Sequence, residues 1–438
     1  MHSESDPAKE GYKKVKIGPK EVYIPEDWRN EKLKSLAQIE SGGTPSTKNP
    51  QFWNGEIPWL TPTDITKNNN KYISESNKKI SLHGLEKSSA KLLPPGTVLM
   101  TSRATIGEAS ISNIKMATNQ GFKSIICGKY LHNEYLYYYL PMIKNYLTAL
   151  GGGSTFLEIS KKDVKNLKIP LPHIDEQKKI SEILSTVDQA IAQTDEIIEK
   201  TQSIKKGLMQ KLLTEGVKHN KFKKIKIYGK ERKIPAGWKI EVLENICRSI
   251  TDGKHGDCEN EENSGFFFIS AKDIHDGKIN YDKARQITEK DFIKTNKRTN
   301  LEPKDNIITN SGTIGKIAIA SEGDQTGRTT FQKSVAIVKP IHEKVDYRFL
   351  SYRLSENVNL LSLNSSGSAQ KNLLLKDLRN FKITLPEINE QKHIAYILSN
   401  VDQKIQKEKE FKQKLEQLKK GLMQDLLTGK KRVSVENT

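Results

Sequence analysis

The sequence predicts a mixed α+β protein in which one unit, a globular domain followed by a long helix, occurs twice. Residues 171–214 and 385–428 match without a gap at more than half of their positions, which chance does not produce over that length. Short apolar runs bounded by Gly, Pro, Ser and Asn precede each copy and are typical of strands. We therefore expect two globular domains and two long helices that form an antiparallel coiled coil, with a pseudo-twofold internal repeat.

The repeat divides the 438 residues into five ranges. Weaker matches also pair the domains: an Ile-Pro-x-x-Trp entry at 24–28 and 234–238, and a Thr-Ile-Gly turn at 105–107 and 313–315. The helices stayed alike while the domains diverged, which indicates a shared constraint on the helices and different ligands for the domains; relaxed drift in loops is the alternative. The ranges are 1–170 (first domain), 171–216 (first helix), 217–384 (second domain), 385–429 (second helix) and 430–438 (tail).

The charge balance favours a polyanionic partner. Lys and Arg number 72 against 53 Asp and Glu, a formal net charge of +19, which suits nucleic acid or an anionic membrane surface; a soluble basic surface is the plainer alternative. No apolar run approaches the roughly 20 residues of a membrane span, and residues 1–20 lack the apolar core of a signal peptide. The scattered Cys127, Cys247 and Cys258 argue against a disulfide framework and fit a reducing cytoplasm.

The strand and helix pattern of the domains is mixed. Apolar runs predict strands at 96–100, 106–111, 123–127, 307–309, 315–319 and 334–338. Residues 135–147 and 347–361 are expected to be helical. These elements support the α+β class.

Each long helix carries an apolar stripe at alternating spacings of three and four, which is typical of a coiled coil. Asp175 and Asn389 are the expected N-caps, and Gly216 and Gly429 the expected ends. The stripe is predicted to shift phase farther along, from Ile197 in one helix and Phe411 in the other, as in a register break. The helix residues expected to pack in the spacer or to bind a partner are Glu176, Gln177, Leu184, Val187, Ile191, Gly207 and Leu208, with Glu390, Gln391, Leu398, Val401, Ile405, Gly421 and Leu422 in the other copy. The mid-helix glycines Gly207 and Gly421 predict a close approach of another backbone.

The Thr-Ile-Gly turns are the most specific local candidates for DNA contact. Guanidinium, amide and hydroxyl groups on a glycine-bounded turn suit base edges and phosphates, because Arg can bond guanine and Asn can bond adenine; a hairpin turn that needs small polar residues is the alternative. Loops at equivalent places in the two domains are weaker candidates. Lys123 and Lys333, which are expected at the same strand position, could neutralise a phosphate, and an exposed strand lysine is the ordinary alternative. The candidates are Gly43, Thr44, Lys48, Ser102, Arg103, Thr105 and Lys123 in the first domain, and Lys254, His255, Asn310, Ser311, Thr313 and Lys333 in the second.

Catalytic constellations are not found in the sequence. It lacks a P-loop, an adenine-methyltransferase motif and the glycine-rich turn of an S-adenosylmethionine site. His255, beside Asp252 and Asp257, has no second histidine, so a loop histidine explains it better than a metal ligand. We expect no catalytic residue, metal or cofactor in this chain.

The repeated motifs resemble the specificity (S) subunits of type I restriction-modification systems. The resemblance covers nearly the whole chain and rests on Leu-Pro-x-Ile-x-Glu-Gln-Lys at 171–178 and 385–392, Val-Asp-Gln at 187–189 and 401–403, and Lys-Gly-Leu-Met-Gln at 206–210 and 420–424. The Ile-Pro-x-x-Trp entries and Thr-Ile-Gly turns belong to the same pattern.

This resemblance implies two target recognition domains, each reading one half of a two-part asymmetric site in double-stranded DNA. The helices would set the spacer and dock two modification (M) methyltransferase subunits, which carry S-adenosylmethionine, and restriction (R) subunits would complete the complex in a prokaryotic cytoplasm. The family pattern does not transfer base-contacting residues. A stand-alone nuclease or methyltransferase and a coiled-coil adaptor that binds only protein remain the alternatives.

Overall fold

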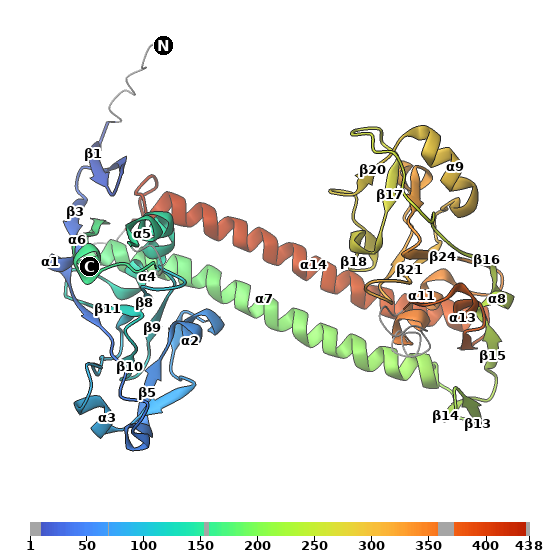
Figure 1. Cartoon of the computed structure of the whole chain (residues 1–438), viewed down its shortest axis with the longest axis horizontal. Helices are drawn as coiled ribbons and strands as arrows, with labels where there is room; N and C mark the ends of the chain where they lie inside the picture. Colours follow the sequence, from blue (N-terminus) through green and yellow to red (C-terminus); the bar gives the residue numbers. More distant parts are fainter. Residues whose placement is uncertain (1–9, 69, 153–156, 358–371, 435–438) are drawn as a thin grey trace, which may run out of the picture. The chain divides into compact units, whose positions relative to one another are not determined.

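The computed structural model describes residues 10–68, 70–152, 157–357 and 372–434, and the chain divides into two compact units (Figure 1). Unit 1 comprises Met1–Asp195 and Glu410–Thr438, and unit 2 comprises Glu196–Lys409. The two long helices are α7 (Ile174–Glu215) and α14 (Ile388–Leu426). Each unit therefore combines one globular domain with a segment of both helices. The predicted mixed α+β fold with two domains and two long helices is confirmed.

The first domain is built on a five-stranded sheet in the order β4-β11-β8-β9-β6, beside a three-stranded sheet in the order β10-β5-β7. The strand pair β12-β3 places residues 29–32 beside the segment that leads into α7, and a hairpin, β1-β2, precedes β3. The strands are β1 (Tyr12–Ile17), β2 (Lys20–Pro25), β3 (Arg29–Lys32), β4 (Ala37–Ser41), β5 (Trp53–Leu60), β6 (Tyr72–Ile73), β7 (Lys78–Ile80), β8 (Val98–Thr101), β9 (Ala109–Ser112), β10 (Ala117–Thr118), β11 (Phe122–Cys127) and β12 (Lys168–Leu171). The helices are α1 (Leu33–Leu36), η1 (Pro50–Phe52), α2 (Pro62–Lys67), α3 (Leu82–Glu86), α4 (Asn133–Tyr139), η2 (Leu140–Ile143), α5 (Lys144–Leu150) and α6 (Lys161–Asn166).

The second domain repeats this plan with a four-stranded sheet, β16-β24-β21-β22, and a three-stranded sheet, β20-β17-β23. Three two-stranded pairs, β13-β14, β15-β25 and β18-β19, accompany them. The strands are β13 (Phe222–Ile227), β14 (Lys230–Pro235), β15 (Lys239–Val242), β16 (Cys247–Asp252), β17 (Phe267–Ile269), β18 (Ile274–His275), β19 (Lys278–Ile279), β20 (Arg285–Gln286), β21 (Asn306–Thr309), β22 (Ile317–Ile319), β23 (Thr329–Phe331), β24 (Val335–Pro340) and β25 (Lys382–Leu385). The helices are α8 (Leu243–Ile246), η3 (Ala271–Asp273), α9 (Glu289–Thr299), α10 (Asp324–Gly327), α11 (Tyr347–Glu356) and α13 (Leu375–Arg379).

All six predicted strands are present, as β8, β9, β11, β21, β22 and β24. The helix predicted over 135–147 is divided into α4 and α5 by the short turn η2, because Pro141 cannot donate a backbone hydrogen bond to a continuing α-helix. The helix predicted over 347–361 is α11 and ends at Glu356; residues 358–361 lie outside the described residues.

The core of each unit joins its domain to the ends of both long helices. In unit 1 the buried Trp28 shares one apolar cluster with Leu184 of α7 and Leu427, just after α14. In unit 2 the equivalent Trp238 shares a cluster with Leu213 of α7 and Leu398 of α14. Each domain thus buries its first tryptophan against residues from both repeats, and this burial accounts for the strong retention of the helix sequences.

The long helices begin earlier than their expected caps. The backbone N–H of Gln177 already donates to the oxygen of His173, and that of Gln391 to the oxygen of Glu387, at 3.0 Å in both. Asp175 and Asn389 therefore lie inside the first turn, and their prediction as N-caps is wrong. The positive φ angles of Gly216 (+70°) and Gly429 (+73°) confirm the predicted ends.

The predicted register break is also wrong. The buried face of α7 keeps its alternating spacing through Thr194, Ile198 and Thr201, while Ile197 and Ile204 are 41% and 58% exposed. The two threonines fit an apolar seam because their hydroxyls donate to the backbone oxygens of the preceding turn, at 2.7 Å each. The spacing of apolar residues alone does not include these threonines, so it placed the exposed isoleucines on the buried face.

The mid-helix glycines do not mark a close approach within the chain. A Cβ atom built on Gly207 or Gly421 meets nothing within 4 Å. We therefore expect Gly207→Ala and Gly421→Ala to raise the free energy of unfolding by up to about 1 kcal/mol each, the difference in helix propensity. Thermal unfolding of the purified chain measures this. A loss of stability would show that the open side of the helix is occupied by a neighbour within the chain.

Candidate DNA interface

The predicted DNA-contacting loops of the first domain meet at one edge of its five-stranded sheet. β11 runs antiparallel to both β4 and β8, so the end of each neighbour lies beside the start of β11. Lys123 pairs with Ser41 at the end of β4, and Phe122 pairs with Thr101 at the end of β8. The segments 42–48, 119–121 and 102–107 therefore share this edge.

The second domain builds the same edge. Ala336 of β24 pairs with Asp252 at the end of β16, and Val335 pairs with Thr309 at the end of β21. The segments that follow β16 and β21 and the one that precedes β24 lie together for the same geometric reason. We call these two surfaces the loop edges of the domains.

Equivalent backbone hydrogen bonds show which positions of the two loop edges correspond. Gly43 N–H donates to the Thr118 oxygen at 2.9 Å, as Lys254 N–H does to the Phe331 oxygen at 2.8 Å. Ser102 N–H donates to the Gly121 oxygen, as Asn310 N–H does to the Ser334 oxygen, at 2.7 and 3.0 Å. The bridges Arg103↔Glu158 and Ser311↔Asn372 correspond in the same way. The equivalent pairs are Thr44 and His255, Ser102 and Asn310, Arg103 and Ser311, Gln120 and Lys333, and Glu158 and Asn372.

This alignment corrects one predicted equivalence. Lys123 and Lys333 were expected at the same strand position, but Lys123 lies inside β11, opposite Ser41, and Lys333 lies in the turn before β24. Lys123 is 4% exposed, so its ammonium group is not presented to solvent, whereas Lys333 is exposed. The counterpart of Lys333 is Gln120, which the sequence comparison missed because the loops differ in length.

The Thr-Ile-Gly turns are closed by their own hydrogen bonds. Gly107 N–H donates to the Thr101 oxygen at 3.0 Å, and Gly315 N–H to the Thr309 oxygen at 2.9 Å. Both glycines have a φ of +88°, which favours glycine. The conserved part of the turn is therefore scaffold. Arg103 and Ser311, which precede the Thr-Ile-Gly residues, are not needed to close the turn, so they can differ between the domains.

Arg103 is held by a carboxylate from a distant part of the chain. Glu158 Oε2 accepts from Arg103 Nε at 2.8 Å and lies 2.7 Å from its Nη2 atom. Glu158 Oε1 accepts from Lys123 Nζ at 2.9 Å, and Lys123 also donates to Ser102 Oγ at 3.2 Å. Burial alone would raise the pKa of Glu158, but the hydrogen bonds from Arg103 and Lys123 outweigh it and hold this pKa below its usual value.

The other candidate DNA-contacting residues of the first domain differ in their solvent exposure. Thr44 and Lys48 are exposed, and Thr44 Oγ1 donates to Gln120 Oε1 at 2.5 Å. Gly43 is buried, and a Cβ atom there would lie 2.2 Å from Ser89 Oγ, so its place in the loop is steric. Thr105 Oγ1 is buried and has no hydrogen-bond partner within the described residues. Their contact with DNA stays a prediction.

The second loop edge carries different chemistry. His255 is exposed, with Nε2 3.4 Å from Asp252 Oδ2, and Lys254 Nζ lies 3.5 Å from Asp291 Oδ1. Asn310 is 7% exposed, and its Oδ1 atom is buried without a partner within the described residues. Ser311 is partly buried and Thr313 is exposed. These residues offer an imidazole, amides and hydroxyls where the first edge offers a guanidinium.

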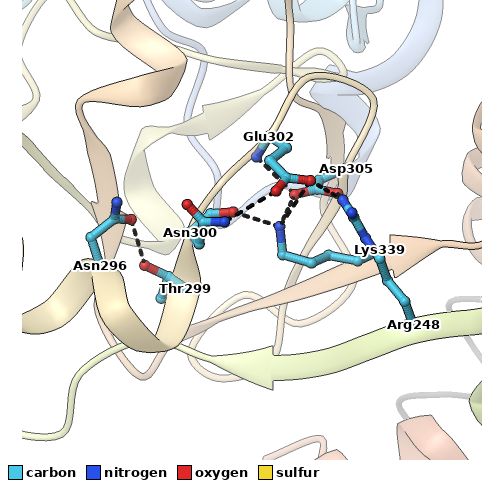
Figure 2. A network of polar contacts seen from close by, with 7 residues as sticks. All are labelled: Arg248, Asn296, Thr299, Asn300, Glu302, Asp305 and Lys339. Carbon is cyan, nitrogen blue, oxygen red and sulfur yellow. Dashed lines mark hydrogen bonds and ion pairs between the residues drawn. The ribbon is translucent and has the colours of Figure 1, made fainter.

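A polar network around the buried ion pair Lys339–Asp305 stabilises the far end of the second sheet (Figure 2). Lys339 Nζ donates to Asp305 Oδ2 at 2.6 Å and to the backbone oxygen of Asn300, at the end of α9. Arg248 joins the same group through Glu302. Because Lys339 and Arg248 lie at the opposite end of β24 and β16 from the loop edge, this network stabilises the sheet and does not contribute to the candidate interface.

The Glu-Gln motif at the start of each helix attaches the domain to that helix. Glu176 Oε2 accepts from Trp28 Nε1 at 3.1 Å, and Glu390 Oε2 accepts from Trp238 Nε1 at 3.0 Å. The repeated Glu-Gln and Ile-Pro-x-x-Trp motifs are thus direct partners.

The neighbouring glutamines connect the helices to the next element of each domain. Gln177 Oε1 accepts from the backbone of His132, which precedes α4, and Gln391 Oε1 from that of Asp346, which precedes α11. Both glutamines are at most 1% exposed. These four motif residues therefore make contacts within the chain; Glu176, Gln177 and Gln391 are buried and Glu390 is partly exposed.

A Tyr-Asp-Lys trio also occurs once in each unit and fixes the antiparallel register. In unit 1 Asp188 of α7 accepts from Tyr138 Oη at 2.7 Å and pairs with Lys419 of α14 at 2.6 Å. The equivalent residues of unit 2, Asp402, Tyr352 and Lys205, make the same contacts at the same distances. Each trio joins one domain and both helices.

Apolar residues at repeated positions stay exposed on the helices. Ile197 and Ile204 in unit 2 correspond to Phe411 and Leu418 in unit 1, which are both 51% exposed. By contrast, Leu184, Val187, Leu398 and Ile405 are buried, and Ile191, Leu208, Val401 and Leu422 are partly buried. The long helices therefore present one packed face and one open apolar face each.

Within the described ranges no group of three or more His, Cys, Asp or Glu is arranged to hold a metal ion. In the same part of the chain no helix has both the length and the apolarity that a bilayer span requires.

Known proteins match this chain over most of its length. The sequence profile described as "Type I restriction modification DNA specificity domain" matches twice, at residues 25–202 and 235–417. The type I restriction enzyme MjaVIII specificity subunit of Methanocaldococcus jannaschii is 28% identical over 421 residues, 94% of this chain and 95% of that protein. The MjaIX specificity subunit of the same organism is 35% identical over 243 residues, and this match spans 54% of each protein.

A solved structure has the same fold. The S subunit of a type I restriction-modification system from M. genitalium aligns with a TM-score of 0.57 and 16% identity, covering 91% of this chain and 96% of that one. Because the two profile matches together span most of the chain, and each contains one loop edge and one Glu-Gln motif, this chain belongs to the type I restriction-modification DNA specificity family.

Proposed function

We propose that this chain is the DNA-specificity subunit of a type I restriction-modification complex, in which each domain binds one half of a two-part asymmetric site in double-stranded DNA. The observation that carries the proposal is the pair of loop edges, which share a backbone scaffold and differ in the side chains placed on it. Different hydrogen-bonding groups at equivalent positions read different base edges. Two related domains with different side chains at equivalent positions therefore suit a DNA site with two unlike halves.

The chain supplies recognition, and its partners supply chemistry. Two M subunits would carry S-adenosylmethionine and methylate adenine, and R subunits would complete the cleaving complex in a prokaryotic cytoplasm. The exposed residues Ile197, Ile204, Phe411 and Leu418 support two equivalent docking places for the M subunits, because an apolar helix face in water favours a covering partner. The net charge of +19 supports strongly salt-dependent DNA binding.

Exchanging residues 20–170 for the matching domain of another family member tests this function. Methylated adenines, mapped in DNA from cells that carry the complete system, should change in one half of the recognised sequence and stay the same in the other. A change in both halves would contradict separate reading by the two domains.

The purified chain alone tests the absence of chemistry. Mixed with duplex DNA, S-adenosylmethionine and magnesium, it should neither methylate nor cleave. Methylation or cleavage by the chain alone would favour a stand-alone enzyme. If the chain together with its M and R subunits showed no sequence-selective DNA binding, a protein-binding adaptor would be favoured.

The helices are proposed to set the spacer between the half-sites. Seven residues inserted into both helices, between Asp195 and Glu196 and between Lys409 and Glu410, keep the spacing of the buried face. They lengthen each helix by about 10 Å, which equals about three base pairs of DNA. Methylation mapping should show a spacer longer by about that amount with both half-sites unchanged. An unchanged spacer would exclude this function of the helices.

A further inference from the structure

The largest chemical difference between the two loop edges lies at one pair of positions. The first domain has Arg103 bridged to Glu158, and the second has Ser311 bridged to Asn372 at the equivalent place. One domain thus places a guanidinium–carboxylate pair where the other places a hydroxyl and an amide.

Glu158 occupies only one side of the Arg103 guanidinium. Glu158 Oε2 accepts the Nε hydrogen and also contacts Nη2, so it covers the edge of the guanidinium formed by Nε and Nη2. The second edge, formed by Nη1 and Nη2, presents one hydrogen from each nitrogen in parallel. The Arg103 side chain is 43% exposed, and no ion pair or hydrogen bond within the described residues engages Nη1. Two parallel N–H donors therefore remain available at the loop edge.

Two parallel donors match the O6 and N7 acceptors of guanine in the major groove, and they also match a phosphate. The surroundings favour the base. Glu158 offsets one of the two positive charges of Arg103 and Lys123, and Lys123 is buried, so the group attracts a phosphate less than an unpaired arginine and lysine would. The carboxylate also limits the rotation of a long side chain, which a base contact needs more than a phosphate contact does.

We propose that Arg103, oriented by Glu158, reads a guanine in the half-site of the first domain. This inference rests on the proposed function and adds the base and the residue. Arg103 is the reading residue. Glu158 is a positioning residue that acts through it.

The test uses the chain assembled with its M subunits and duplexes that carry the mapped site. Each G·C pair of the first half-site is replaced in turn, and each guanine separately by 7-deazaguanine, which lacks the N7 acceptor. The wild-type complex should lose roughly 5- to 150-fold in affinity at one guanine, as expected for a bidentate contact. Arg103→Ala should abolish that preference and leave every other position unchanged.

The positioning residue has its own variant. Glu158→Gln combined with Lys123→Met removes the carboxylate and the buried ammonium together, so no buried charge is left unpaired. This double variant should weaken the preference at the same guanine while the second half-site is read normally, which shows that the subunit is folded. Ser311→Ala in the second domain is the matched control and should leave the first half-site unaffected.

Several outcomes would overturn the inference without touching the proposed function. One is a first half-site that has no G·C pair. Another is a uniform loss of affinity for all sequences in Arg103→Ala, with a weaker salt dependence, which would identify a phosphate contact. Unchanged discrimination in Arg103→Ala would likewise overturn it. A wild-type complex that recognises no two-part site would instead contradict the proposed function.

Discussion

Replacing Gln391 by alanine should lower the free energy of unfolding of unit 2 by about 3 kcal/mol. The side chain is 1% exposed and makes three hydrogen bonds to the backbone. Its Oε1 atom accepts from Asp346 N–H at 2.9 Å, and its Nε2 atom donates to the oxygens of Lys344 and Pro386 at 3.1 and 2.9 Å. Alanine would leave these buried backbone groups without partners, and each such group costs about 1–3 kcal/mol unless water reaches it.

The repeat supplies a matched variant in the other unit. Gln177→Ala removes the same three contacts, to His132, Tyr130 and Pro172, and should destabilise unit 1 to a similar degree. Gln403, exposed on α14, is the control, and its replacement by alanine should change stability by less than about 0.5 kcal/mol.

Hydrogen exchange of the assembled subunit gives the local readout. In Gln391→Ala the amides at the start of α11 should exchange faster while those of α4 keep their protection. Gln177→Ala should show the reverse. Equal loosening of both units by either variant would show that the glutamines do not act locally.

The motifs could be found from the sequence, but their partners could not. The repeat shows that Glu-Gln and Ile-Pro-x-x-Trp are retained, and the structure shows why: Glu176 bonds Trp28, 148 residues away along the chain. A single sequence cannot predict a contact between two residues so far apart along the chain. The same limit hid Glu158, which lies 55 residues after Arg103.

Two predictions from the sequence were wrong for identifiable reasons: polar residues occupy buried positions on a helix, and the loops of the two domains differ in length. Thr194 and Thr201 occupy the helix seam by bonding their own backbone, so a search for apolar residues passed over them. The pairing of Lys123 with Lys333 failed because a slip of a few residues moves a side chain from a turn into a strand. Strand registers, which no composition or spacing gives, were needed to match Lys333 with Gln120.

Replacing Arg432 by alanine should destabilise unit 1 by about 2–4 kcal/mol. Glu176 is 3% exposed, and its carboxylate receives Arg432 Nε at 2.7 Å, Arg432 Nη2 at 3.0 Å and Trp28 Nε1. The Arg432 guanidinium donates hydrogen bonds to the carboxylates of Glu176 and Asp27, and these bonds raise the pKa of Arg432. Without Arg432 the buried carboxylate keeps one donor, and an uncompensated buried charge costs about 3–5 kcal/mol. The Arg432 side chain is 43% exposed, so water offsets part of this cost.

Two further variants separate the charge from the packing. Arg432→Ala with Glu176→Gln removes the charge together with its partner, and thermal unfolding should show that the double variant regains at least half of the loss. In unit 2 the equivalent Glu390 receives Trp238 Nε1, His219 Nε2 and the backbone N–H of Val217. His219→Ala leaves two of these donors in place, so it should cost less than Arg432→Ala. A double variant no more stable than Arg432→Ala would mean that the contact of the guanidinium with the Trp28 ring, 5.9 Å from its centroid, carries the stability instead.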